Sequence, residues 1–307
     1  MKKKPKIKIF VAHHKPWYIY EDDVYVPIQV WKKNAKVDLW ILWDDTGDNI
    51  SEKNDNYAEL TAQYWVWKNY DLRDVDYVWF CHYRRYMTYC YKPTFWNYLF
   101  VKNPFGILDT PFPYLWKIKS WKEWNVFLKY KENILLKNKK ELLKYISENE
   151  NDIYTVKREV LIEWKLRKFF WMQVNGFFDF CFDWIWKSDR DRKYKAKEIF
   201  LKMYPDYEWI IKDVMEECKE YFPLHRHVFI MRKDLFYEYM NRLFKYLFAL
   251  EEYINKNHLQ TSWIYGDGES RFMWIFSEPL INYRKLRAER ERWVKVSSKS
   301  NLLFFID

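Results

Sequence analysis

The sequence is poor in glycine. It has 5 glycines and 19 tryptophans in 307 residues, whereas an average chain contains about 7% glycine. An α/β fold needs glycine at tight turns, because glycine adopts positive φ freely and lets other backbones and ligands approach. One hypothesis is that many of these tryptophans stand where the host inserts glycine, through a UGA codon read under the wrong genetic code. The alternative is an unusually aromatic protein.

The cysteines form no metal-binding or disulfide pattern. The chain has four, none in a CxxC pair and none with a His-rich companion spacing: Cys81, Cys90, Cys181 and Cys218. This argues against a structural zinc site and a disulfide framework and fits a reducing cytosol.

The sequence also lacks long apolar runs. The apolar stretch near the start is interrupted by Lys8 and ends at His13, which is too short for a signal peptide. No uncharged run approaches the roughly 20 residues that cross a bilayer. We therefore expect a cytoplasmic protein, with peripheral attachment to the inner face of the cell membrane as an option.

The net charge is +10. An excess of positive charge favours acidic partners, namely phosphorylated small molecules, an anionic membrane surface or nucleic acid. The sign of the charge does not choose among them.

The order of the predicted elements indicates an open α/β sheet. Strands are expected at `KIKIFVAHH`, at `KVDLWILWDD` and at residues 76–81, with a helix over residues 51–69 in which Asn56 and Glu59 form a capping box. Further along, residues 228–231 predict a strand followed by an amphipathic helix, residues 132–146 a Lys-rich helix, and the charged tail `YRKLRAERERWVKVSSKS` a helix end. Charged residues follow the strands, so the site is expected along that edge of the sheet.

The first candidate site segment is `DDTGDNIS`, which contains Asp44, Asp45 and Asp48. Three carboxylates so close together repel one another unless donors or a cation neutralise them. The spacing does not match a calcium loop. Its place after a strand suits hydrogen bonding to a nucleobase or ribose, and the alternative is a solvated acidic turn in which Asp45 or Asp48 caps the next helix.

The second segment is `CHYRRY`, in which His82, Arg84 and Arg85 follow an apolar strand. Two guanidinium groups can grip a diphosphate, and a neighbouring histidine can donate a further hydrogen bond as charge develops on the leaving group. One alternative is that the arginines pair structurally with the acidic segment. Another is that the flanking tyrosines stack on single-stranded nucleic acid.

The third segment is `GDGESRFMWIFSEPL`. Arg271 and Glu278 lie on one face if a helix continues there, although Pro279 disturbs this pattern. The pair is a candidate for a base or an acceptor-binding group, and a structural ion pair is the alternative.

Together these segments resemble a family of capsular or exopolysaccharide biosynthesis glycosyltransferases that was long catalogued as a domain of unknown function. The resemblance rests on matches across nearly the whole chain, densest in the first 86 residues: `HKP` at 14–16, `PIQVW` at 27–31, `DDTGDNIS` at 44–51, `ELTAQYWVWKN` at 59–69, `CHYRRY` at 81–86, `FIMRK` at 229–233 and `RFMWIFSEPL` at 271–280. Trp31 and Trp274 stand at glycine positions of that family pattern, and glycine is also expected at Trp43 and Trp79. Pro279 replaces the family's arginine.

The resemblance implies a GT-A-like fold, that is, an open sheet flanked by helices, in a single domain over residues 1–307 with helical additions. Residues 1–86 would form the nucleotide-sugar-binding part and residues 222–290 the acceptor side. Such folds usually hold a divalent metal through an Asp-x-Asp at the strand end where this chain has `CHYRRY`. We therefore expect metal-independent transfer without a cofactor, since fixed cations can stabilise the departing diphosphate.

The expected function is inverting transfer of a hexose, with galactofuranose as one option, from a UDP-sugar to a lipid-linked surface polysaccharide intermediate. The donor-binding residues would be His13, Asp44, Asp45, Asp48, His82, Arg84, Arg85 and Arg271. His82 would also act catalytically, and the base would be Glu278, with Asp267 as the second choice. No nucleic acid is expected. The alternative function is a non-catalytic protein that binds a sugar or nucleotide, or a basic RNA-binding protein.

Overall fold

The structure is a computed structural model. It describes residues 4–83, 85–88, 135–136, 139–155, 198–199, 201–205, 229–257, 273, 277, 296–297 and 302–305. The predicted boundary between a donor part and an acceptor part is not tested by these residues and stays a prediction.

The described strands form one mixed sheet. Its main path has the order β3-β2-β1-β4-β7-β6-β8, and β5 pairs with β4 and β9. The strands are β1 (Ile7–His13), β2 (Tyr25–Gln29), β3 (Leu42–Trp43), β4 (Tyr77–His82), β5 (Arg85–Thr88), β6 (Ile153–Thr155), β7 (Phe229–Arg232), β8 (Val296–Ser297) and β9 (Leu302–Phe305).

The four strands β3, β2, β1 and β4 run parallel. Successive residues of a strand point to opposite faces of the sheet, and in β1 Phe10 contributes to one core cluster and Ile9 and Val11 to the other. Both faces of β1 are therefore covered, which explains why the run is continuously apolar rather than alternating.

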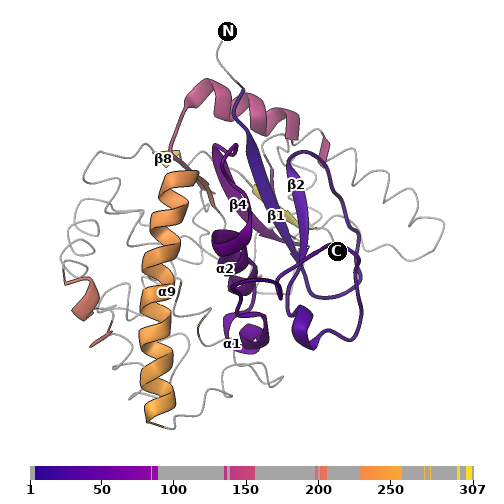
Figure 1. Cartoon of the computed structure of the whole chain (residues 1–307). Coiled ribbons are helices and arrows are strands. Elements are labelled where there is room, and N and C mark those ends of the chain that lie inside the picture. Colours follow the sequence, from indigo (N-terminus) through magenta and orange to yellow (C-terminus); the bar gives the residue numbers. More distant parts are fainter. Residues whose placement is uncertain are drawn as a thin grey trace, which may run out of the picture.

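Helices α2 (Leu60–Asn69) and α9 (Lys233–Lys256) cover one face of the sheet, and Figure 1 shows α9, in orange, beside α2. Phe236, Met240, Leu243 and Leu247 recur at helical spacing in α9 and are buried in that core. On the other face, Leu142 and Ile146 of the helical residues 139–149 pack against the sheet. The prediction of an open α/β sheet flanked by helices is confirmed.

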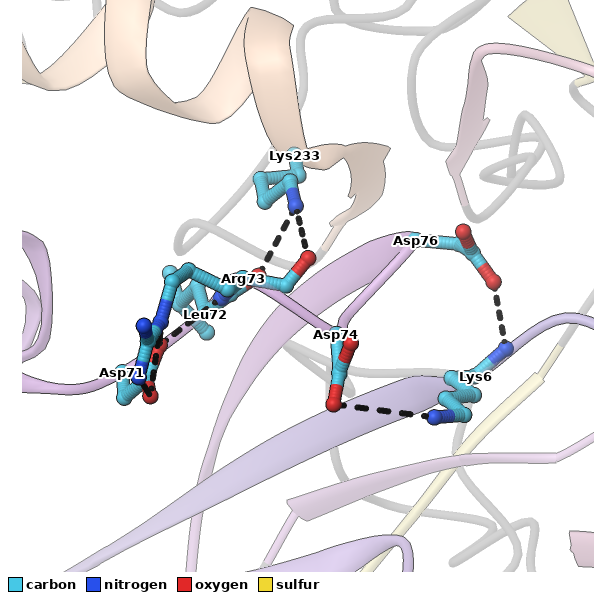
Figure 2. A network of polar contacts seen from close by, with 7 residues as sticks. All are labelled: Lys6, Asp71, Leu72, Arg73, Asp74, Asp76 and Lys233. Atoms are coloured by element: carbon cyan, nitrogen blue, oxygen red, sulfur yellow. Dashed lines mark hydrogen bonds and ion pairs between the residues drawn. The ribbon is translucent and has the colours of Figure 1, made fainter.

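A polar network joins three segments at the amino-terminal edge of β1 and β4 (Figure 2). The backbone N–H of Lys6 donates to Asp76 Oδ2 at 2.8 Å. Lys233, the first residue of α9, donates from Nζ to the carbonyl oxygens of Leu72 and Arg73 at 2.9 and 2.7 Å. The network ties α9 to the loop before β4, on the side of the sheet away from the predicted site.

The structure confirms several of the predicted strands and helices. The first strand corresponds to β1, the strand at 76–81 to β4, the strand at 228–231 to β7, and the amphipathic helix to α9. The Lys-rich helix overlaps the helical residues 139–149.

Four predictions are wrong. The strand expected at residues 36–45 contains only the two residues of β3, and β2 was not predicted. The helix expected over 51–69 is divided into η2 (Ser51–Lys53), α1 (Asn54–Tyr57) and α2, because Ala58 adopts φ 47°. The expected capping box is wrong as well, because Asn56 lies inside α1 and Glu59 is itself at the N-cap of α2. The charged tail includes strand β8 where a helix end was expected.

Among the described residues, no helix combines the length and apolar character that a membrane-spanning segment requires.

Candidate functional site

The carboxyl ends of β1, β2 and β4 meet at one edge of the sheet. In the parallel register Ala12 pairs with His82, and His13 pairs with Gln29. The `HHKP` and `CHYRRY` segments, about 70 residues apart in the sequence, are thereby adjacent. This is the edge at which open α/β sheets bind ligands, and the predicted location of the site agrees with it.

Three histidines gather around Tyr83 at this edge. The ring centroid of Tyr83 lies 4.1 Å from that of His82, 5.1 Å from that of His14 and 5.6 Å from that of His13. Lys15 Nζ lies 6.0 Å from the same ring. The cluster therefore concentrates groups that donate hydrogen bonds or carry positive charge, as an anionic ligand requires.

His13 is the buried member of this cluster. Its side chain is 0% exposed, and neither ring nitrogen has a hydrogen-bond partner among the described residues. Burial, assisted by the nearby His14, lowers the pKa of His13 to about 4. His13 is therefore neutral at pH 7, so it can orient a ligand or its neighbours but does not contribute positive charge.

The chain reverses direction immediately after β4. The first residue of β5, Arg85, pairs antiparallel with His82, and Tyr83 after β4 is a turn residue. The backbone of Arg85 thus lies at the predicted edge. The conformation of Arg84 and the side chain of Arg85 lie outside the described part of the chain, and their contact with a diphosphate stays a prediction.

Asp44 is buried and bound by donors from this chain. Its side chain is 0% exposed. It accepts hydrogen bonds from the backbone N–H groups of Trp31 and Lys32, both at 3.2 Å, and from Ser51 Oγ at 2.6 Å. Burial raises the pKa of Asp44, and these hydrogen bonds oppose the shift. These contacts favour a structural role, in which Asp44 holds the loop after β2. The predicted contact between Asp44 and a nucleoside stays a prediction.

The rest of the `DDTGDNIS` loop is fastened to α2. Trp65 Nε1 donates to the carbonyl oxygen of Thr46 at 2.9 Å, and Tyr64 OH donates to Asp48 Oδ1 at 2.8 Å. Asn69 accepts from the Asp48 N–H at 3.0 Å and donates to the Asp48 carbonyl at 2.8 Å. These contacts explain why `DDTGDNIS` and `ELTAQYWVWKN` occur together. Asp48 is tied to α2, whereas Asp45 is half-buried and adjacent to the edge.

A hollow opens at the same edge, between the strand ends and α1. It is lined by residues of β1 and β4, by residues that follow β1 and β2, and by the α1–α2 segment: Ala12, His14, Val30, Trp31, Asn54, Asp55, Ala58, Glu59 and His82. His82 was predicted as a site residue. His14, Asn54, Asp55 and Glu59 were not, although His14 is adjacent to the predicted His13. No sequence signal marks the break at Ala58 that brings Asp55 and Glu59 to the hollow.

The third predicted segment is almost entirely outside the described residues. This includes Asp267, Arg271 and Glu278, so their roles stay predictions. Met273 and Ser277 are described and are buried. Within the part of the chain that the structure describes, no three His, Cys, Asp or Glu side chains are grouped as a metal site.

The fold and the candidate site define an α/β protein with a hollow at the carboxyl edge of its parallel strands. The chain belongs to the family described as "Domain of unknown function (DUF4422)", whose profile matches residues 8–285. No curated protein matches the chain in sequence.

The chain is also similar to a solved structure described as a WbbM bifunctional glycosyltransferase in its apo form. The TM-score is 0.68 and the sequence identity 26%, over 98% of this chain and 45% of the other. This chain therefore spans less than half of that bifunctional protein.

Proposed function

We propose that this protein is a glycosyltransferase that moves a hexose, with galactofuranose as one option, from a UDP-linked donor to a lipid-linked surface polysaccharide intermediate. The observation that carries the proposal is the convergence of `HHKP` and `CHYRRY` on a hollow at the carboxyl edge of the sheet. The similarity to a bifunctional glycosyltransferase supports it. Because the chain covers 45% of that protein, we assign it one of the two transfer activities.

The donor diphosphate would lie against His82, Arg84 and Arg85. His82 lines the hollow, and the two arginines follow it directly in the sequence. Guanidinium groups bind phosphate through paired hydrogen bonds. Their fixed charge can stabilise the leaving UDP in the transition state, which is the work a divalent metal does in other transferases. The proposed transfer is therefore metal-independent.

We propose that the carboxylates in the hollow bind the hydroxyl groups of the donor rather than its diphosphate. Asp55 and Glu59 line it beside the amide of Asn54, and carboxylates accept hydrogen bonds from ribose or sugar hydroxyls. Asp45 is retained as a candidate nucleoside contact. His13 would support Tyr83, with which it stacks at an interplanar angle of 29°.

The acceptor side is assigned from the third segment. An inverting transfer needs a carboxylate that deprotonates the acceptor hydroxyl. Glu278 is proposed for this role, with Asp267 as the alternative and Arg271 facing donor or acceptor. A GT-A-like arrangement and attachment to anionic lipid belong to the same proposal, since each Lys or Arg near a lipid surface contributes about 1 kcal/mol.

A thermal-shift screen of nucleotide sugars tests the donor class, because a ligand that binds only the folded state raises the melting temperature. UDP-sugars should raise it more than GDP- or CMP-sugars do. His82→Ala should reduce the shift, and Arg73→Ala should not, because Arg73 pairs with Asp71 at the opposite edge of the sheet. Equal shifts for all nucleotides, or none, would refute the donor assignment.

A further inference from the structure

Two tryptophans of this chain adopt a backbone conformation that suits glycine. Trp31 has φ 61° and Trp40 has φ 56°. In this region the Cβ atom is crowded by the following carbonyl oxygen, so a bulky residue is an outlier there and glycine is not. The two positions are nine residues apart, in the segment between β2 and β3.

At position 31 the left-handed conformation accompanies two backbone contacts to Asp44. The N–H groups of Trp31 and Lys32 point at the same buried carboxylate, and each donates to a different oxygen of Asp44 at 3.2 Å. A concave turn that includes a left-handed residue is one backbone conformation that points successive amides at the same anion. Asp44 would otherwise be a buried carboxylate with fewer donors, so φ at position 31 is not free to relax.

The indole of Trp31 makes a poor fit to its surroundings. Its Nε1 is buried, with no hydrogen-bond partner among the described residues, whereas buried indoles usually find one. The side chain also lines the hollow, whose volume is about 60 Å³. Ligand pockets usually measure about 300–1,000 Å³. The hollow therefore has a position and lining that suit a nucleotide, and the Trp31 indole occupies part of its space.

Trp40 gives independent evidence, because it is not among the residues that line the hollow. Its side chain is 86% exposed, so the indole gains little from burial. Its N–H donates to Asp38 Oδ1 at 2.9 Å, which holds the backbone in a tight turn. The exposed indole therefore contributes little that would offset the cost of the left-handed backbone conformation.

Trp65 shows what a well-fitted tryptophan looks like in the same protein. It is a buried residue of α2, and its Nε1 donates to both the carbonyl oxygen and Oγ1 of Thr46. Trp43 and Trp79 occupy strands without positive φ, so their backbone does not identify them as glycine. Trp274 lies outside the described residues.

We infer that the working protein carries glycine at positions 31 and 40, through UGA codons that its host reads as glycine, and tryptophan at position 65. Glycine at position 31 keeps the turn that binds Asp44 and removes the indole from the hollow. It thereby controls access of the donor's nucleoside to the site. The role of position 31 in donor access rests on the proposed function, whereas the residue identities do not.

The codons and the host protein test the residue identities. We expect UGA at positions 31 and 40 and UGG at position 65. Peptides of the protein isolated from its host should contain glycine at the first two positions and tryptophan at the third. UGG codons at 31 and 40, or tryptophan in those host peptides, would overturn the inference.

Recombinant full-length variants test the physical argument. Trp40→Gly should lower the unfolding equilibrium constant by about 5–30-fold relative to Trp40→Ala, because both remove the exposed indole and only glycine relieves the backbone. Equal stability of the two variants would contradict the requirement for glycine at position 40.

Ligand binding tests the role of position 31. Trp31→Gly should lower the Kd of UDP by about tenfold or more, which is a gain of about 1.4 kcal/mol. Trp40→Gly, which lies away from the hollow, should leave that Kd unchanged. If the host peptides contain glycine but Trp31→Gly does not bind UDP, the residue identities stand and the proposed donor is wrong.

Discussion

Ser51 Oγ lies 2.6 Å from the Oδ1 of Asp44 and donates a hydrogen bond to it. The same carboxylate accepts hydrogen bonds from the backbone N–H groups of Trp31 and Lys32, which follow β2. Asp44 thus connects the end of β3 with the loop after β2 and with η2.

Asp44→Asn should destabilise the protein. An asparagine presents one acceptor oxygen and one donor group, so the Trp31 N–H would face an NH₂ instead of an oxygen. We expect a loss of about 1–3 kcal/mol in the free energy of unfolding, measured by urea denaturation at pH 7. Asp45→Asn is the control, and it should change stability by less than about 0.5 kcal/mol. Equal effects would mean that the amide contacts do not stabilise the loop.

His13 should make stability depend on pH. Its pKa is lowered from 6.5 to about 4 in the folded state, so the unfolded chain binds more protons between these values. The contribution is fully present above pH 6.5 and is lost as the pH falls toward 4, by about 3 kcal/mol in total. His13→Phe keeps an aromatic ring against Tyr83 and removes the titration. The difference in unfolding free energy between the two proteins should therefore vary across this range, and a constant difference would refute the assignment.

Gly47→Ala should be destabilising for two separable reasons. Gly47 has φ 58°, and an added Cβ would overlap the Oδ1 of Asn69. Placing alanine at this positive φ costs about 1–2 kcal/mol of unfolding free energy. The overlap between the new Cβ and Asn69 adds a further cost. In an Asn69→Ala background the second component disappears, so Gly47→Ala should cost less there than in the parent protein. A double-mutant cycle measures this coupling, and additive effects would show that the two side chains do not meet.

Chelation should leave transfer nearly unchanged. The proposed electrophilic groups are His82, Arg84 and Arg85, which need no bound ion to carry their charge or donate hydrogen bonds. UDP release from a UDP-sugar in the presence of acceptor should be the same with and without EDTA. A large loss of activity with EDTA that Mn²⁺ or Mg²⁺ restores would contradict metal-independent transfer and would favour Asp45 or Asp48 as metal ligands.

The sequence predicted the strands that are uniformly apolar and missed those whose pairing is short or partial. β2 contains Pro27, which lacks an N–H for sheet pairing and discourages a strand assignment. Pro27 is nevertheless accommodated, because β3 pairs only with Ile28 and Gln29 and leaves that side of Pro27 unpaired. The expected strand at 36–45 is cut short by the positive φ of Trp40 and by the side chain of Gln29, which bonds to Val37 and Leu39.

The candidate site was predicted at the level of strand ends. His13 and His82 follow apolar runs, and parallel strands place such residues at one edge. The sequence could not show that Asp44 accepts hydrogen bonds from the N–H groups of Trp31 and Lys32, because those contacts depend on the backbone conformation at Trp31. It also could not place Asp55 and Glu59 in the hollow, since an alanine at position 58 does not signal a positive φ.

The central claim is that cationic side chains at the carboxyl edge of β4 hold the diphosphate of the donor. Isothermal titration of UDP into the full chain at low ionic strength tests it most directly, with the Arg84→Ala/Arg85→Ala double variant compared with Arg73→Ala. Each lost charge-assisted contact should weaken binding by about 10–100-fold, whereas Arg73→Ala should bind as tightly as the parent protein. Equal Kd values for all three proteins would contradict the account.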